Sequence, residues 1–531
     1  MYSQKCMKIQ TVDAENPHAN SWTNFLNRPL DNWWCFIGWA VSSLLFFEVI
    51  LGLGGPTVGD SEETVYNTWA ISHGDFTCAY PPVAHVHLSN LTHAPVFGAP
   101  LYSIFAAGVA ALFRIGHTVV FPPTVALGTN CADALTAIDH WANQSNAVLP
   151  TVQIGYLSWL LLLGGIVALL RTSIRGLRGW EPFTLVIVAV APPVFMCILD
   201  AYHPQDLMAV GFVLMGVAFA RRDSWIWAGV LIGLAITSHQ FAVLVALPLV
   251  IISPRDRRFR FAAAMICTVA VVTVPLVLLS SQRVLHAILF GSSRIVLFGL
   301  GSTKSHGGTV LWELHLREPL LFLLTRLMPI ALSMLLAWWT SRRLGASVFD
   351  LEWLLPLLAT ALSLRLVFEE NLYGYYFMAV AVSLILLDVI RGRIRGSLVA
   401  WLALVTMAFN PIPWSLGWGG MTERNHLRLL LPLLAIAFAI VLIGVDMARH
   451  RIRWYLLGWL AIVLITYQPW RGLVMPPPVV PTWLWQLILV PTGIMLGAGS
   501  LWSLRSDASA AEVLGRDSPF AAKSVASSQR T

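Results

Sequence analysis

Basic clusters that follow long apolar runs are the feature that most constrains this chain. Six arginine-rich segments end or separate these runs: residues 171–178, 221–222, 255–260, 342–343, 391–395 and 449–453. Acidic, histidine and amide motifs lie at the opposite ends of the same runs. Short loops rich in Lys and Arg stay on the cytoplasmic side of a membrane. The pattern therefore predicts a basic inner face and an outer face that gathers the residues capable of chemistry.

The balance of apolar and charged residues predicts a polytopic membrane protein. Of the 531 residues, 57% are hydrophobic and 11% are charged, whereas a soluble domain carries roughly 25% charged residues. The net charge of +7 comes from the inner-face arginines and predicts contact with anionic membrane lipid rather than nucleic acid. Polar residues 1–32 predict a cytoplasmic segment without a cleavable signal peptide. The Ala/Ser-rich residues 506–531 predict a disordered cytoplasmic tail.

The lengths of the apolar runs predict many membrane crossings. With re-entrant segments included, we expect an all-α bundle of about 12–15 transmembrane or re-entrant helices, because a crossing needs about 20 apolar residues. A long first extracytoplasmic loop, near residues 54–150, follows the first crossing. The expected crossings are 33–53, 151–170, 181–199, 205–220, 261–280, 319–340, 351–367, 372–390, 397–414, 427–447, 454–468 and 482–503.

Two stretches do not fit simple crossings. Residues 223–254 lie between two inner-face clusters, yet at about 1.5 Å per residue each half is too short to cross. We expect a short helical hairpin that turns at 237–240. Residues 94–114 either re-enter the membrane or pair with 118–128 as a second hairpin. Non-helical backbone at membrane depth persists only against protein or a wet cavity, so both stretches predict a cavity open to the outer side.

Two acidic residues directly follow the first expected crossing. Asp60 and Glu62 are candidate catalytic residues, because a partly shielded carboxylate at a membrane–water boundary can have a raised pKa and act as a general base. The alternative is structural: Asp60 or Ser61 would cap a helix from Glu62 to His73, with Glu63 completing a capping box. The two roles are compatible.

Residues 202–206 join two crossings on the outer side. Pro204 suits the first position of a helix, and Asp206 complements the positive end of the helix dipole. Capping explains Asp206 but not His203 or Gln205. An ionisable residue at the membrane boundary favours a functional role, so we take His203 and Asp206 as candidate catalytic residues and Gln205 as a candidate for substrate binding.

The expected hairpin turn carries two further polar candidates. His239 and Gln240 are costly in lipid but not in a wet cavity. They either bind substrate or belong to a turn that is satisfied by local hydrogen bonds.

Arg365 departs from the pattern because it lies at an outer boundary. A guanidinium makes paired bonds to phosphate and keeps its charge in a low dielectric, so Arg365 is a candidate to bind a lipid phosphate, with Glu369 and Tyr375 beside it. Alternatively, Arg365 pairs with Glu369 one helical turn away and the tyrosines form an interface belt. Arg294 and Lys304, on a second expected outer segment, are further phosphate candidates.

Cysteines and histidines add little chemistry. Cys78 and Cys131 both fall in the first outer segment; in an oxidising compartment they can form a disulfide, and the sequence leaves paired and free states open. His85 and His87 are not followed by a further ligand with convincing spacing, so no metal site is expected. No glycine-rich phosphate loop or dinucleotide fingerprint is present in the sequence, so no nucleotide cofactor is expected.

The order and sidedness of these motifs resemble the GT-C membrane glycosyltransferases, most of all the glycosyltransferase 87 family, which depends on polyprenyl-phosphate mannose. The resemblance covers roughly residues 33–400 and rests on Gly59 with Asp60, Tyr80 with two prolines, the 203–206 connection, the 238–241 turn, and Arg365 with Tyr375 and Tyr376. It implies that Asp60 deprotonates the acceptor and that Arg365 holds the donor phosphate. It also implies a catalytic module at 33–400. About three extra spans follow residue 400, a departure from the family pattern that we expect to add transmembrane helices within 401–505. The longer His-rich segment before residue 95 departs from the family pattern.

We therefore expect an enzyme that transfers a sugar, mannose or arabinose, from a polyprenyl-phosphate donor to an envelope glycolipid or glycan. The reaction would occur on the extracytoplasmic face of the plasma membrane and need no cofactor beyond the donor. The alternative is a transporter or flippase of lipid-linked glycans, which would use the same cavity but require access from both faces. A non-catalytic scaffold for envelope assembly is a third interpretation.

Overall fold

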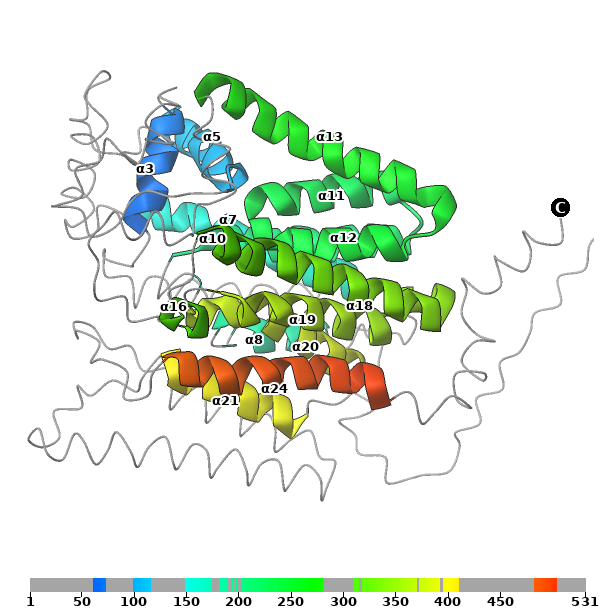
Figure 1. The fold of residues 1–531 in the computed structure, drawn as a ribbon. Helices are drawn as coiled ribbons and strands as arrows, with labels where there is room; N and C mark the ends of the chain where they lie inside the picture. Colours follow the sequence, from blue (N-terminus) through cyan, green and yellow to red (C-terminus); the bar gives the residue numbers. More distant parts are fainter. Residues whose placement is uncertain are drawn as a thin grey trace, which may run out of the picture.

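The computed structural model describes a helical protein (Figure 1). It covers residues 61–72, 99–115, 149–173, 181–189, 202–280, 309–314, 318–369, 372–391, 395–409 and 482–503, together with four positions between 191 and 197. Every regular element within these ranges is helical, and no strand occurs in them. The expected all-α fold class is therefore confirmed for this part of the chain.

The helices are short to medium in length, and several are interrupted. They are α3 (Ser61–Ser72), α5 (Leu101–Ile115), α7 (Leu149–Leu170), α8 (Glu181–Ala189), α10 (Pro204–Arg221), α11 (Trp225–Ser238), η3 (Gln240–Ala242), α12 (Val243–Ile252), α13 (Arg255–Ser280), α16 (Val310–Glu313), α17 (Glu318–Phe322), the π-helical turn η4 (Leu323–Leu327), α18 (Met328–Leu344), η5 (Gly345–Phe349), α19 (Leu351–Val367), η6 (Gly374–Phe377), α20 (Met378–Ile390), α21 (Gly396–Phe409) and α24 (Thr482–Ser503).

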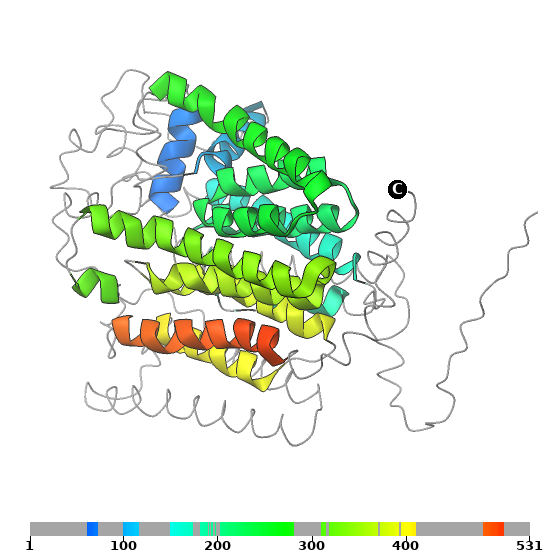
Figure 2. The same cartoon turned by 45° about the vertical axis from the view of Figure 1, so that its right-hand side comes forward.

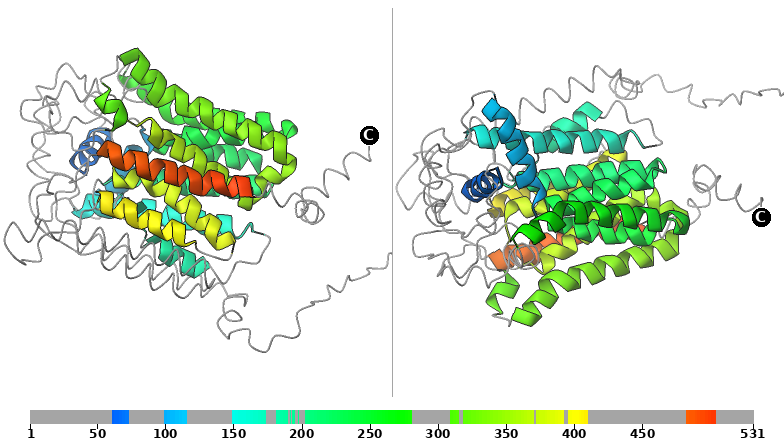
Figure 3. Two further views of the ribbon diagram at one scale, coloured as in Figure 1. Left: turned by 60° about the horizontal axis from the view of Figure 1, so that its bottom comes forward. Right: turned by 90° about the horizontal axis from the view of Figure 1, so that it is seen from above.

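Most of these helices run side by side as one bundle, whereas α3 lies across one end of it (Figures 1 and 2). Helix α10 packs against α7 and α11, and α11 packs against α13. On the other side α19 packs against α20 and α24, and α18 joins the two halves by contacting α12 and α19. Views from below and above show the same arrangement (Figure 3).

Arginines at helix ends gather at one end of the bundle. Arg221, the last residue of α10, donates from Nε to Oγ1 of Thr172 at 3.0 Å, just after α7, and from Nη1 to the carbonyl of Phe349, just before α19. Arg257, in the first turn of α13, lies 3.4 Å from Asp223, between α10 and α11. The ends of five helices, α7, α10, α11, α13 and α19, therefore meet at one place.

A buried ion pair adds two more helices to this arginine-rich end. Nε of Arg395 lies 2.6 Å from Oδ1 of Asp388, whose side chain is fully buried near the end of α20. Nη1 of the same arginine donates to Oγ of Ser500, near the end of α24, at 3.0 Å. The described basic clusters therefore share one end, as the sequence pattern predicts.

Three described helices are long and apolar enough to cross a membrane: Arg255–Leu279, Leu320–Leu344 and Trp483–Leu501. Large apolar side chains stand exposed along α13, where Phe259 is 80%, Val271 73% and Leu278 79% exposed. Water-soluble proteins rarely expose contiguous apolar surface of this kind. The length and exposure of these helices suggest a membrane protein.

Glycines four residues apart allow close helix contacts, a common device of membrane helices. Gly229 and Gly233 turn the same face of α11 to α13; a Cβ atom at Gly233 would lie 2.7 Å from Cβ of Thr268 and 2.8 Å from the carbonyl of Met265. In α24 the pair Gly493 and Gly497 does the same against α19 and α21. Small residues therefore set the spacing in both halves of the bundle.

The hairpin expected at 223–254 is confirmed. Helix α11 ends at Ser238, His239 adopts an extended backbone, and the chain returns through η3 and α12. The helix expected from Glu62 to His73 is observed as α3, Ser61–Ser72, whereas its predicted cap lies outside the described residues and side chains. The 181–199 run differs from the single crossing that was expected. Helix α8 covers only Glu181–Ala189 of this run. Four expected segments lie outside the described residues: 33–53, 118–128, 427–447 and 454–468.

Replacing Gly233 by alanine should lower the stability of the bundle by about 1–3 kcal/mol, because the new methyl group overpacks the contact between α11 and α13. The measurement is thermal unfolding of the purified protein in detergent. Gly108→Ala is the matched control, since nothing lies within 4 Å of a Cβ atom built there. Equal melting temperatures for the two variants would contradict the close contact.

Candidate functional site

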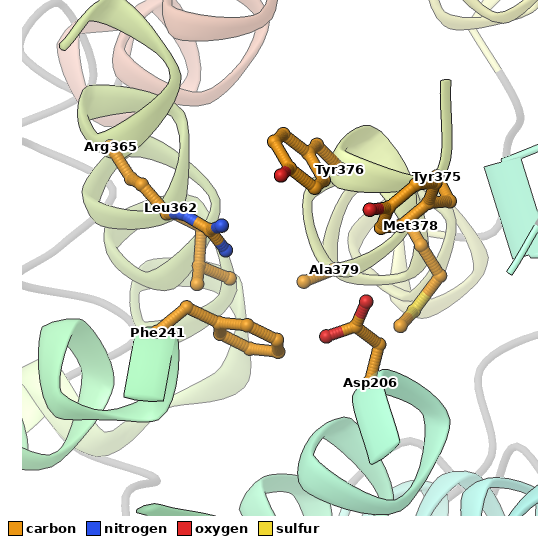
Figure 4. Close-up of a pocket in the computed structure, with 8 residues that line it drawn as sticks. All are labelled: Asp206, Phe241, Leu362, Arg365, Tyr375, Tyr376, Met378 and Ala379. Carbon is orange, nitrogen blue, oxygen red and sulfur yellow. The ribbon is translucent and has the colours of Figure 1, made fainter. Parts of the chain in front are cut away.

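A pocket lies at the end of the bundle opposite the arginine-rich end. It contains about 290 Å³ of empty space, including space open to solvent. Figure 4 shows side chains from α10, η3, α19, η6 and α20 converging on it. The residues that line it are Asp206, Phe241, Leu362, Arg365, Tyr375, Tyr376, Met378 and Ala379. The pocket thus combines one cation, one carboxylate and an otherwise apolar or aromatic wall.

The first turn of α10 places Asp206 in the pocket. Pro204 occupies the first position of the helix, where the missing N–H costs nothing. Tyr202, two residues earlier, has a φ of 50°, a left-handed conformation that non-glycine residues rarely adopt. Its hydroxyl lies 3.1 Å from that of Tyr102 on α5, a buried contact that fixes the entry into α10. Asp206 is 4% exposed.

The hairpin turn brings His239 against Asp206. Nε2 of His239 lies 3.2 Å from Oδ1 of Asp206. The other ring nitrogen, Nδ1, accepts from the backbone N–H of Phe241 at 3.3 Å. A neutral imidazole carries its proton on only one nitrogen, so Nε2 is the protonated one and faces the carboxylate.

The neutral form of His239 is favoured by its surroundings. Burial lowers the pKa of His239 well below its usual value, and the positive charges of Arg365, His203 and Arg326 lower it further. The imidazole therefore stays uncharged at neutral pH and can donate only through Nε2. His239 is therefore a fixed, uncharged polar neighbour of Asp206: Nε2 approaches Oδ1 closely, but the geometry is not that of a hydrogen bond.

Arg365 projects from the last turn of α19 into the pocket. Its Nε donates to Oε2 of Glu369 at 2.9 Å, and the two side chains are 13% and 8% exposed. The guanidinium also lies 4.8 Å from the ring centre of Tyr376 and 5.6 Å from that of Phe241. Among the described residues, no hydrogen-bond acceptor meets its two terminal nitrogens, which point into the pocket in Figure 4.

The end of α19 is held by segments distant in sequence. Oγ1 of Thr309 donates to the carbonyl of Glu369 at 2.7 Å. Nε2 of Gln486, on α24, donates to the carbonyl of Leu366 at 2.8 Å, while its Oε1 accepts from the N–H of Val310 at 3.0 Å. The open carbonyl of Leu366 in the last turn of α19 is therefore satisfied, and these contacts hold the backbone from which Arg365 projects.

His203 and Gln205 form a second polar pair beside the pocket. Nε2 of Gln205 lies 2.8 Å from Nδ1 of His203. The ring of His203 stacks on Tyr375 with 4.3 Å between ring centres. Tyr375 in turn lines the pocket, so this pair supports one of the aromatic walls.

The structure brings most of the described candidates together. Asp206, Arg365 and Tyr375 line the pocket, while His203, Gln205, His239 and Glu369 contact those residues directly. The expected pairing of Arg365 with Glu369 is confirmed. Gln240 begins η3 but is not among the residues that line the pocket.

Other candidates lie outside the described residues: Asp60, Arg294, Lys304, Cys78 and Cys131. Glu62 belongs to the first turn of α3, but its side chain is not among those described. The roles assigned to these residues stay predictions. Within the described ranges, no group of three or more His, Cys, Asp or Glu side chains is arranged to hold a metal ion.

Sequence reasoning missed Gln486 and the apolar wall of the pocket. Gln486 is a lone amide inside the apolar run 482–503, and such a residue in a membrane helix usually bonds another helix. That pattern could have identified Gln486 as a residue that contacts another helix, but it does not indicate which groups Gln486 bonds. Leu362, Met378 and Ala379 carry no signal that separates them from other core residues.

No family model matches this sequence, and no curated protein sequence matches it either. Function is therefore inferred from the residues of the pocket and from the motif order described above.

Replacing Arg365 by glutamine should lower the free energy of unfolding by about 3 kcal/mol, because it leaves Glu369 as a buried carboxylate without its cation. The double variant Arg365→Gln, Glu369→Gln should recover much of that loss. Chemical unfolding of the single and double variants in detergent measures the coupling. Purely additive losses would show that the two side chains do not stabilise each other.

Proposed function

We propose that this protein is a multi-pass plasma-membrane glycosyltransferase of the GT-C type. It transfers mannose or arabinose from a polyprenyl-phosphate donor to an envelope glycolipid or glycan on the extracytoplasmic face. The observation that carries the proposal is the pocket itself. An arginine held by Glu369 presents two terminal nitrogens to a space that also contains a carboxylate.

The sidedness of the bundle supports an extracytoplasmic site. The described arginine clusters gather at one end, and the pocket lies at the other. Short basic segments remain cytoplasmic during membrane insertion. The pocket would then face the outer side, where lipid-linked sugars rather than nucleotide sugars serve as donors in the resembling family.

The geometry of Arg365 favours phosphate as its ligand. Glu369 occupies Nε and fixes the plane of the guanidinium, which leaves the terminal nitrogens as a pair of parallel donors. Such a pair matches two oxygens of a phosphate. The surrounding rings of Tyr376 and Phe241 limit water and strengthen the attraction.

Sugar transfer to a hydroxyl group needs a base and a stabilised leaving group. As the acceptor oxygen forms a bond to the anomeric carbon, its proton passes to a carboxylate, and the bond between that carbon and the phosphate oxygen breaks. The phosphate leaves with the electron pair, and Arg365 stabilises the negative charge that develops on it. The family resemblance assigns the base to Asp60.

Arg365→Gln should lower kcat/KM for the lipid-linked donor by about 10²–10³-fold, the usual effect of losing a donor that stabilises developing charge. Arg365→Lys should have a kcat/KM between those of the wild type and Arg365→Gln, because a lysine keeps the charge but not the planar pair of donors. Transfer of radiolabelled sugar from polyprenyl phosphate to envelope glycolipids by purified protein is the measurement.

Arg222→Gln is the matched control, since Arg222 is an exposed arginine at the opposite end of the bundle. A similar loss of activity in both variants would mean that Arg365 has no special role toward the donor.

Asp60→Asn should abolish turnover and leave binding of the lipid donor largely intact, because an amide cannot accept the proton of the acceptor hydroxyl. Turnover and donor binding are measured on the same preparation in nanodiscs. Full activity in this variant would remove Asp60 as the base. Movement of the lipid-linked sugar across proteoliposomes without any transfer product would instead favour the flippase interpretation.

A further inference from the structure

The pocket contains a second charged group whose role the phosphate site does not explain. Asp206 faces Arg365 across the pocket from a different helix (Figure 4). Arg365 already has Glu369 as its hydrogen-bonded partner. A further buried carboxylate is therefore not needed to balance the arginine.

The neighbours of Asp206 orient it rather than neutralise it. The imidazole of His239 approaches Oδ1 through its protonated Nε2 and is itself anchored by the N–H of Phe241. Asp206 also lies in the first turn of α10, where the helix dipole favours negative charge. An ionised carboxylate can only accept hydrogen bonds.

The ligand that fits this pair of charges carries an anion at one end and a neutral donor at the other. A phosphate on Arg365 would repel a second anion near Asp206, and a cation there would compete with Arg365 for the carboxylate. A hydroxyl group avoids both problems, because it donates a hydrogen bond without adding charge. A phosphate ester of a polyhydroxylated ring has these groups at adjacent positions.

We infer that Asp206 binds a hydroxyl group of the donor sugar whose phosphate is bound by Arg365, and that His239 is the positioning residue that orients this carboxylate. The inference rests on the proposed function and names the part of the donor that the site recognises.

The test compares lipids with and without the sugar. The affinities of polyprenyl phosphate, polyprenyl-phosphate mannose and polyprenyl-phosphate arabinose are measured on full-length protein in nanodiscs. The sugar-dependent gain is the affinity for the better sugar lipid divided by that for polyprenyl phosphate. Asp206→Asn should reduce this gain by about tenfold or more, the usual effect of removing a hydrogen bond to a charged group, and should not weaken binding of bare polyprenyl phosphate, because the removed carboxylate repels the phosphate.

Two substitutions of His239 separate positioning from folding. His239→Asn keeps an acceptor for the N–H of Phe241 but removes the Nε2–H group that lies beside Asp206. His239→Gln is long enough to place an amide N–H near Asp206. His239→Asn should lose much of the sugar-dependent gain, and His239→Gln should retain more of it. Binding of bare polyprenyl phosphate shows whether each variant is folded.

The outcomes distinguish this inference from the proposed function. Wild-type protein that binds none of the three lipids would overturn the proposed function and the inference with it. Wild-type protein that binds bare polyprenyl phosphate as tightly as the sugar lipids would overturn the inference alone. So would an Asp206→Asn variant that loses affinity equally for all three, because Asp206 would then serve the fold rather than the sugar.

Discussion

The ion pair between Arg365 and Glu369 is the interaction on which the candidate site depends. It lies at the end of a buried helix, and both partners are largely removed from solvent. A buried guanidinium without a carboxylate would be costly, and so would the carboxylate alone. Because Glu369 occupies only Nε, the pair keeps the arginine in place and still leaves its terminal nitrogens toward the pocket.

The remaining structure supplies the rigidity that this pair needs. Gln486 on α24 and Thr309 before α16 satisfy the end of α19, while the glycine pairs of α11 and α24 set helix spacing on either side of the pocket. At the opposite end, Arg221 and Arg395 connect helix ends to one another. The pocket residues and the arginines that join helix ends thus lie at opposite ends of the bundle.

Periodic and charge signals predicted much of this arrangement, because they depend on local sequence. The hairpin turn at His239 followed from run lengths, and the position of Arg365 followed from its departure from the arginine pattern. Contacts between segments that are distant in the chain are harder to predict from the sequence. The approach of His239 to Asp206 requires α10 and the hairpin to pack together, and no local pattern encodes that distance. The interruption of the 181–199 run was likewise invisible in its uniformly apolar composition.

The most direct test of the account is an experimental structure of the full-length protein with polyprenyl phosphate bound. The account predicts the phosphate within about 3 Å of the terminal nitrogens of Arg365, and the carboxylate of Asp60 facing the same pocket. A phosphate bound at the arginine-rich end, or Asp60 on the opposite side of the membrane from Arg365, would contradict it.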